Sequence, residues 1–409
     1  MNKASPNPSE GGEQFPPFGG IKGGSSPSEG GVRGGCIYIH IPFCKQLCYY
    51  CDFHFSLQLK NRTALVSAIC KELQMRNNFF ENPIHTIYFG GGTPSLLSIE
   101  EIELILNTIH TLWQVEEHAE ISFECNPDDM LPEYMQGLYE LGINRLSVGI
   151  QSFVDEELIP INRRHNSEQA RRCIDTAQQA GFRNISIDLI YGLPKQTFNS
   201  WKTSLEIAQK LDLQHISTYC LTVEKNTALN NFVQKKIFRV APEELVLQQF
   251  EYLQQWAQEH NFEHYELSNF ARNGAYSRHN TGYWQQTPYL GVGPSAHSYN
   301  GRERLWNIAH NKKYIDAISS NTLACESEIL SLHDRYNEYV LTGLRTMWGV
   351  NMRYIQNNFP NFFSTFASKV QSYAQKELLV IENETVRLSK KALLIADGII
   401  ENLFIVENN

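Results

Sequence analysis

Three cysteines, Cys44, Cys48 and Cys51, lie within one stretch of eight residues. They follow an apolar, β-branched run over residues 36–41 that stops at Pro42, which predicts a strand followed by a loop. Loops at strand ends are common positions for cofactor sites. Clustered thiolates are ligands for a soft metal centre, either iron–sulfur or zinc. Because three ligands leave one coordination position open, the spacing predicts a centre that can bind a further ligand.

Zinc is the main alternative to iron–sulfur at these cysteines. His40 or His54 could complete a tetrahedral Cys₃His shell. Structural zinc sites, however, usually use a second, separated ligand pair, and no second C-x-x-C follows in this chain. Ordinary burial of the three thiols is disfavoured too, because Lys45 and Gln46 between them make a poor apolar core.

The composition is that of a globular protein with a sizeable core. The chain has 409 residues, 42% of them hydrophobic and 19% charged. Its formal charge of −9 argues against an electrostatic nucleic-acid binder, which would carry a basic footprint. Nine cysteines, an odd number with three clustered, do not form the pattern of a secreted disulfide framework. We therefore expect a cytoplasmic protein, and the sequence has no apolar stretch long enough to span a membrane.

Alternating strand and helix patterns predict an α/β fold. Residues 1–35 are rich in Gly, Pro and Ser and are expected to be a disordered extension. Six β/α pairs then favour a parallel sheet curled into a partial (β/α)₆, TIM-like barrel within residues 36–300. Residues 301–409 are expected to form a mainly helical, winged-helix-like domain. The six predicted strands cover residues 37–41, 86–89, 120–125, 145–150, 185–191 and 215–221.

The polar residues at the ends of these strands should meet at one mouth. A parallel barrel places its site at the carboxyl ends of its strands. The cysteines follow strand one, Gly91 to Thr93 follow strand two, Glu124 ends strand three, Gln151 ends strand four and Asp188 lies in strand five. The glycine run lacks the period of a dinucleotide fingerprint and the ending of a P-loop. It is either a tight turn or bare backbone against which a small ligand lies.

The spacing C-x-x-x-C-x-x-C after a strand resembles the radical S-adenosylmethionine (SAM) superfamily. The resemblance implies a [4Fe–4S] cluster held by three cysteines, with SAM on the fourth iron. It also implies a set of SAM-contacting positions, in which Arg164 could exchange roles with Arg163. These positions are Tyr38, Tyr50, Gly91, Gly92, Thr93, Glu124, Gln151, Arg163 and Asp188. Chemically, a carboxylate such as Glu124 can accept bonds from an ammonium, and an arginine pairs with an anion.

Longer strings around the cysteines are similar to two related groups, the oxygen-independent coproporphyrinogen oxidases and the HemW heme chaperones. The oxidases carry a further cysteine two places beyond the third ligand, where this chain has Phe53. His279-Asn280-x-x-Tyr283-Trp284 resembles a signature of the HemW branch that is associated with heme. A histidine can ligate heme iron and aromatic rings can stack on the macrocycle. A core cluster around a hydrogen-bonded histidine is the alternative for this motif.

The resemblance therefore implies a heme chaperone that holds a [4Fe–4S] cluster, SAM and heme and delivers heme to apoproteins such as respiratory cytochromes. The first alternative is a radical SAM coproporphyrinogen III oxidase, and the second is a zinc-stabilised interaction protein. The sequence assigns no catalytic residue. It leaves open both peripheral membrane contact and a homodimer, and it indicates no nucleic-acid partner.

Overall fold

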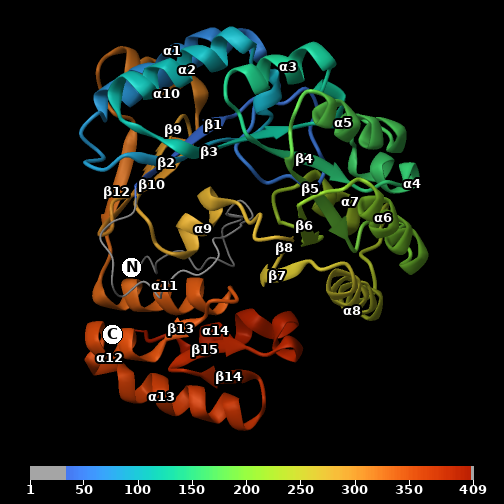
Figure 1. The fold of residues 1–409 in the computed structure, drawn as a ribbon, viewed down its shortest axis with the longest axis vertical. Coiled ribbons are helices and arrows are strands. Elements are labelled where there is room, and N and C mark those ends of the chain that lie inside the picture. Colours follow the sequence, from blue (N-terminus) through green and yellow to red (C-terminus); the bar gives the residue numbers. More distant parts are fainter. Residues whose placement is uncertain (1–33, 407–409) are drawn as a thin grey trace.

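The computed structural model describes residues 34–406, whose strands form a large sheet of twelve strands and a small sheet of three (Figure 1). Six neighbours in the large sheet, β1 to β6, run parallel in chain order. They are β1 (Gly35–Ile41), β2 (Ile84–Gly91), β3 (Val115–Cys125), β4 (Arg145–Gln151), β5 (Asn184–Tyr191) and β6 (His215–Cys220). The six predicted strands are therefore confirmed, and with them the α/β fold class.

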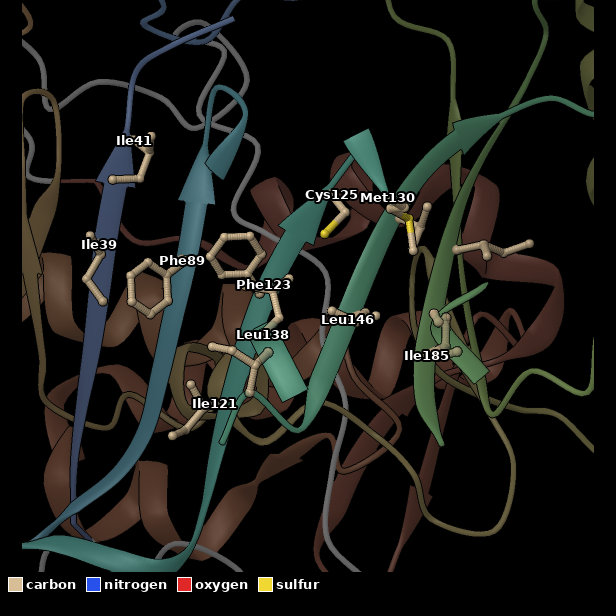
Figure 2. Close-up of a cluster of buried hydrophobic side chains, with 14 of the residues drawn as sticks. Ile39, Ile41, Phe89, Ile121, Phe123, Cys125, Met130, Leu138, Leu146 and Ile185 are labelled. Atoms are coloured by element: carbon tan, nitrogen blue, oxygen red, sulfur yellow. The ribbon is translucent and has the colours of Figure 1, made fainter. Parts of the chain in front are cut away.

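Helices cover one face of these strands because alternate strand residues are apolar and need burial there. Figure 2 shows Ile39 of β1, Phe89 of β2 and Phe123 of β3 in this layer, and all three are fully buried. The helices that connect the parallel strands are α1 (Arg62–Met75), α2 (Ile99–Leu112), α3 (Pro132–Glu140), α4 (Asp155–Leu158), α5 (Ser167–Gln179) and α6 (Phe198–Lys210).

The opposite face of the same strands is polar. Tyr38, Glu124 and Asp188 alternate with the buried apolar residues, so they point away from the helices and line a cavity. Parallel strands buried on both faces usually consist of continuous apolar runs. Here the second face keeps its polar groups because it forms the wall of a site.

Short strands that the sequence pattern does not predict extend both edges of the sheet. β9 pairs in parallel with β1, and β10, β11 and β12 follow it in antiparallel order. At the other edge, β8 pairs with β6 and β7 pairs with β8, both antiparallel. These strands are β7 (Glu263–Glu266), β8 (Asn269–Ala271), β9 (Tyr289–Val292), β10 (His297–Tyr299), β11 (Glu303–Asn307) and β12 (Cys325–Ile329).

Four helices accompany these edge strands. They are α7 (Ala228–Gln234), α8 (Glu243–Glu259), α9 (Arg278–Trp284) and α10 (Asn311–Ser319). α9 lies between the sheet and the C-terminal part of the chain, where it contacts β2, β3 and the helix α11 (Leu332–Leu344) (Figure 1). This position puts the HNxxYW segment against the inner face of the sheet.

A buried carboxylate on α1 forms hydrogen bonds with the edge of the large sheet that β9 to β12 build. Glu72 of α1 is fully buried and its two oxygens accept four hydrogen bonds. Arg76 Nε (2.9 Å) and Asn307 Nδ2 (2.8 Å) donate to Oε1, whereas the Gly293 N–H (3.0 Å) and the Tyr314 hydroxyl (2.6 Å) donate to Oε2. One side chain thereby connects α1, the turn after β9, β11 and α10.

The last part of the chain has a hydrophobic core of its own, built around Tyr336, Phe366 and Leu403. Its elements are α11 (Leu332–Leu344), β13 (Val350–Asn351), α12 (Met352–Asn358), α13 (Pro360–Gln375), β14 (Leu379–Glu382), β15 (Thr385–Leu388) and α14 (Ala396–Leu403). The predicted mainly helical domain is thus present, and it includes a small hairpin of β14 and β15. Its start at residue 301 stays a prediction. β11 and β12 belong to the large sheet, α10 packs into the core of that sheet, and the separate core begins with α11.

The Gly/Pro/Ser-rich extension predicted for residues 1–35 lies outside the described residues except for its last two positions. Across residues 34–406, no helix combines the length and the apolar character that crossing a bilayer requires.

Candidate cofactor site

A cavity of about 250 Å³ opens at the carboxyl ends of the parallel strands. Every residue that the sequence assigned to the metal centre or to SAM lines it. These residues are Cys44, Cys48, Cys51, Tyr38, Tyr50, Gly91, Gly92, Thr93, Glu124, Gln151, Arg163 and Asp188. The structure therefore brings the twelve positions together, and their individual roles stay predictions.

The cysteine loop is held in place by the segment that follows β4. The Asn162 side chain donates to the Leu47 carbonyl (2.6 Å), and the Gln46 side chain donates back to the Asn162 carbonyl (2.9 Å). The Tyr49 N–H donates to the Ile161 carbonyl (3.1 Å). Asn162 adopts a left-handed conformation with φ of 60°, which asparagine tolerates better than most residues. These bonds fix the backbone from which Cys48 and Cys51 project.

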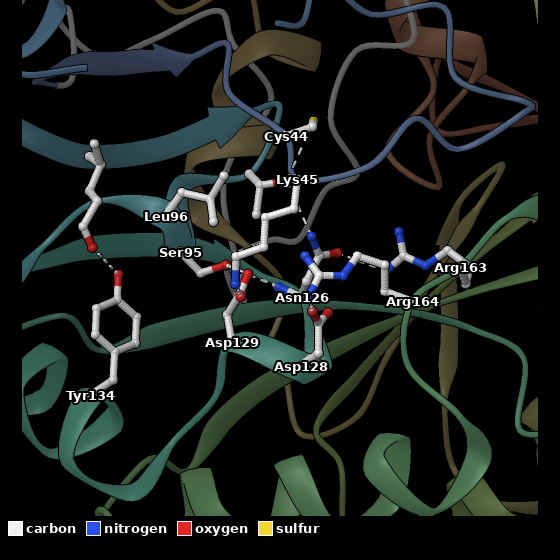
Figure 3. Close-up of polar contacts among 12 residues, drawn as sticks. Cys44, Lys45, Ser95, Leu96, Asn126, Asp128, Asp129, Tyr134, Arg163 and Arg164 are labelled. Carbon is white, nitrogen blue, oxygen red and sulfur yellow. Dashed lines mark hydrogen bonds and ion pairs between the residues drawn. The ribbon is translucent and has the colours of Figure 1, made fainter. Parts of the chain in front are cut away.

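A second anchor ties the same loop to the ends of β2 and β3. Lys45 forms an ion pair with Asp129, and Ser95 donates to the other oxygen of that carboxylate at 2.9 Å (Figure 3). Asp129 is almost fully buried, so its charge needs both partners. The lysine between the first two cysteines is thus a structural tether, which explains a charged residue inside the cysteine cluster.

Backbone crowding explains the glycine run. Gly91 has φ of 107°, and a Cβ on it would lie 2.6 Å from the His40 ring. A Cβ on Gly92 would lie 2.7 Å from the Phe43 carbonyl oxygen, because the chain entering the cysteine loop crosses this position. The predicted tight turn is therefore present, and Gly91 and Gly92 line the cavity. Contact between a small ligand and their backbone stays a prediction.

Two of the three thiols each lie next to a hydrogen-bond donor. Thr93 Oγ1 lies 3.5 Å from Cys44 Sγ, and Arg163 Nη1 lies 3.3 Å from Cys48 Sγ. Arg163 also donates to Asn126 Oδ1 at 2.7 Å, and its buried Nε has no acceptor among the described residues. Such donors stabilise thiolate sulfur, so the set fits an anionic iron–sulfur cluster. Arg164 instead pairs with Asp128 at 3.3 Å, which separates the roles of the two arginines.

The histidines proposed to complete a zinc shell are engaged elsewhere. The ring nitrogens of His40 are hydrogen-bonded with the Tyr38 hydroxyl and the His54 carbonyl, each at 3.2 Å. His54 Nε2 is bonded with Asn311 Oδ1 at 2.8 Å. No group of three or more His, Cys, Asp and Glu side chains within residues 34–406 is arranged to hold a single ion. This geometry does not support the zinc alternative.

Two half-buried carboxyl groups, Glu124 and Asp188, make the cavity favourable for a cation. Burial raises the pKa of Glu124 to about 8, and Asp188 nearby adds to the shift, although the Tyr88 hydroxyl donates to Glu124 at 2.8 Å. Burial likewise raises the pKa of Asp188 to about 6, against donation from Ser217 and Ser147. A cation favours the ionised form of a carboxylate. SAM carries an ammonium and a sulfonium, so the acidic walls fit this cofactor.

SAM binding should therefore strengthen with pH between about 6 and about 8. A cation next to Glu124 lowers the raised pKa of this group, so binding releases a proton and the affinity rises with pH by at most about tenfold per unit. Calorimetric titration of the reconstituted protein in buffers of different ionisation enthalpy measures this release. Glu124→Gln should bind SAM more weakly and lose most of the pH dependence. An unchanged profile in that variant would exclude Glu124 as the linked group.

The HNxxYW segment lies apart from the cavity. His279 is fully buried; its ring nitrogens are hydrogen-bonded with Thr86 Oγ1 (2.7 Å) and the Tyr283 hydroxyl (3.1 Å), and its ring stacks on Tyr88 at 5.0 Å. Burial lowers the pKa of His279 to about 3, so the ring is neutral. Neither Tyr283 nor Trp284 lines the cavity. This geometry matches a hydrogen-bonded core histidine; ligation of heme iron by His279 stays a prediction that requires α9 to leave β2.

Sequence reasoning missed two residues that organise the cavity wall. Tyr88 positions Glu124, and Asn126 connects Arg163 with Thr93 by accepting from the first and donating to the second (3.1 Å). Tyr88 shares the inner face of β2 with Thr86, so the alternation within that strand was the signal that could have identified it. Asn126 follows β3 in a turn, where no periodicity points to a site.

Comparison with known proteins agrees with this geometry. A sequence model of the radical SAM superfamily matches residues 38–208, and a model of the HemN C-terminal domain matches residues 330–395. The solved structure of Escherichia coli coproporphyrinogen III oxidase (HemN), a radical SAM enzyme, is similar to this chain. The TM-score is 0.80 and the sequence identity is 22%, and the similarity covers 95% of this chain and 94% of that chain. The fold and the cysteine loop thus define a radical SAM protein, the class that uses a [4Fe–4S] cluster and SAM.

Relatives that match most of the chain identify its family within the radical SAM class. Heme chaperone HemW of Bacillus subtilis is 33% identical over 88% of this chain and 97% of the relative. HemW of Synechocystis is 34% identical over 76% of this chain and 78% of the relative. The bovine mitochondrial radical S-adenosyl methionine domain-containing protein 1 is 30% identical over 93% of this chain and 89% of the relative. The chain belongs to the heme chaperone HemW family.

Proposed function

We propose that this chain is a heme chaperone that binds heme and passes it to acceptor apoproteins, with a [4Fe–4S] cluster and SAM as its cofactors. The cofactor part of this proposal rests on the cavity, which is lined by three cysteines, a glycine run and two half-buried carboxyl groups. The heme part rests on family membership and on relatives whose names describe heme chaperones. A cytoplasmic location suits it, because reducing conditions keep the thiols free to ligate.

The cavity residues have distinct tasks in this proposal. Cys44, Cys48 and Cys51 would hold the cluster, and Arg163 and Thr93 would donate to its sulfur ligands. Glu124 would accept from the ammonium of SAM beside the glycine backbone. When bound, the cluster presents one iron without a cysteine ligand, to which SAM can attach.

A coproporphyrinogen III oxidase is the second candidate, since the HemN structure shares the fold over most of the chain. At 22% identity this likeness concerns the fold alone. Phe53 occupies the position where the oxidases are expected to have a further cysteine, and its side chain lines the cavity. A phenyl ring can neither ligate nor transfer a proton there, which favours the chaperone.

Anaerobic reconstitution followed by three assays tests the proposal. We expect bound iron and sulfide, a Soret band on titration with hemin, transfer of that heme to an apocytochrome, and no decarboxylation of coproporphyrinogen III. Turnover of the porphyrinogen would establish the oxidase instead. Absence of a Soret band from a protein with an intact cluster would refute the chaperone function while leaving the radical SAM site in place.

A further inference from the structure

We propose that heme docks outside the cavity mouth, on the exposed loop over residues 235–240, with its macrocycle against apolar side chains and its propionates on the loop's cations. We name residues 235–240 the rim loop. This inference rests on the proposed function, since it assigns the place where the chaperone takes its heme.

The cavity at the carboxyl ends of the strands is assigned to other cofactors. The cluster and SAM would occupy it before heme is taken up. Its walls carry the carboxyl groups of Glu124 and Asp188, which cannot form an ion pair with a propionate. His279 is sealed between α9 and β2. A porphyrin must therefore make its first contacts on the surface.

The rim loop is connected to the cysteine loop through helix α7. The Leu229 N–H at the start of α7 donates to the Tyr49 carbonyl at 2.8 Å. The Phe232 ring packs edge-on against Tyr49 at 4.9 Å between centroids, and Phe238 packs on Phe232 at 5.4 Å. The Ile237 N–H donates to the Phe232 carbonyl at 2.9 Å, so the loop folds back on α7.

The other end of the rim loop reaches the cavity wall. A Cβ placed on Gly192 would lie 3.9 Å from the Cβ of Ala241, which follows the loop, and 3.9 Å from the Cβ of Leu221. Leu221 lines the cavity. The rim loop is therefore linked through α7 to Tyr49 of the cysteine loop, and the residue after it, Ala241, lies near Gly192 and Leu221 at the cavity wall.

The side chains of the rim loop have the chemistry that heme requires. Ile237 and Val240 are 60% and 52% exposed, an unusual state for aliphatic side chains. Lys235, Lys236 and Arg239 are exposed, and none of them forms an ion pair within residues 34–406. Three cations in five residues contrast with the formal charge of −9 of the chain. Heme combines an apolar macrocycle with two carboxylates, which matches this arrangement.

Two more exposed apolar residues lie beside the same mouth. Phe53 is 42% exposed and lines the cavity, and Ile159 is 72% exposed in the turn whose Ile161 carbonyl accepts from Tyr49. Exposed apolar groups gathered around one opening mark a binding surface more often than scattered single ones do. They would offer a second face for the macrocycle.

Hemin titration of a charge-reversed rim loop tests the inference. Lys235, Lys236 and Arg239 are changed together to glutamate in the reconstituted full chain, and the Kd for hemin should rise on the order of tenfold. The matched control reverses Arg171, Arg172 and Lys210, which are exposed on the outer helices α5 and α6, and should leave the Kd unchanged. Ile237→Ser should weaken the binding of both hemin and its dimethyl ester. The charge reversal should weaken only hemin, because the ester has no propionate charge.

Separate readouts keep the possible failures apart. Cluster absorbance and SAM affinity should be the same in both triple variants. If wild-type protein binds no hemin, the proposed function itself fails. If wild-type protein binds hemin and charge reversal leaves the Kd unchanged, only the rim-loop inference is refuted. A variant that keeps its hemin affinity but loses binding to anionic phospholipid vesicles would also refute it and would assign the loop to a membrane surface.

Discussion

Cys48→Ala is expected to abolish both assembly of the [4Fe–4S] cluster and binding of SAM. His40 and His54, the two histidines proposed as further ligands, are hydrogen-bonded elsewhere, so neither is free to replace the lost thiolate. Arg163 would also lose its sulfur partner at 3.3 Å. Iron and sulfide analysis with calorimetric SAM titration measures both losses.

The control for this variant is Cys325→Ala. Cys325 is a free, half-buried cysteine on β12, far along the sheet from the loop, and its loss should leave the iron content unchanged. Wild-type iron content in the Cys48 variant would show that the three-cysteine interpretation is wrong.

Glu72→Ala is expected to lower the free energy of unfolding by about 3–5 kcal/mol, the largest stability effect that we predict. The substitution leaves the guanidinium of Arg76 buried without its anion. It also leaves the side chains of Asn307 and Tyr314 without their acceptor. Urea unfolding of the cofactor-free protein measures the change.

Glu103→Ala on the neighbouring helix α2 is the matched control, because Glu103 is exposed and forms no described ion pair. Its effect should stay within about 0.5 kcal/mol. If the Glu72 variant loses less than about 1 kcal/mol in free energy of unfolding, the four hydrogen bonds do not stabilise the edge formed by β9 to β12.

The parallel strands were predictable because each carries enough residues to show its pattern. β1 to β6 have six to eleven residues each, with β-branched or apolar residues on one face and turn residues after them. β8 and β10 have three residues each, too few to establish a period of two. Their pairing depends on the strands beside them, which a local pattern does not contain.

The sequence predicted which residues gather at the candidate site, but not which hydrogen bonds and packing contacts surround individual side chains. Strand order and the carboxyl-end rule placed the cysteines, Gly91, Glu124 and Asp188 at one mouth, and the resemblance added Arg163. Burial of Glu72 was hidden, because one glutamate in an amphipathic helix normally faces water. The environment of His279 was hidden too, since the motif does not show that Thr86 and Tyr283 bond to both ring nitrogens.

The electron paramagnetic resonance spectrum of the reduced, anaerobically purified protein, recorded with and without SAM, tests the central claim most directly. Three cysteine ligands leave one iron of the cluster free, and SAM bound there changes its electronic environment. We predict a [4Fe–4S] signal whose g values shift when SAM is added, and no such shift in Glu124→Gln at a SAM concentration that saturates wild type. A cluster signal that SAM leaves unchanged, or a preparation that contains zinc in place of iron, would contradict the account.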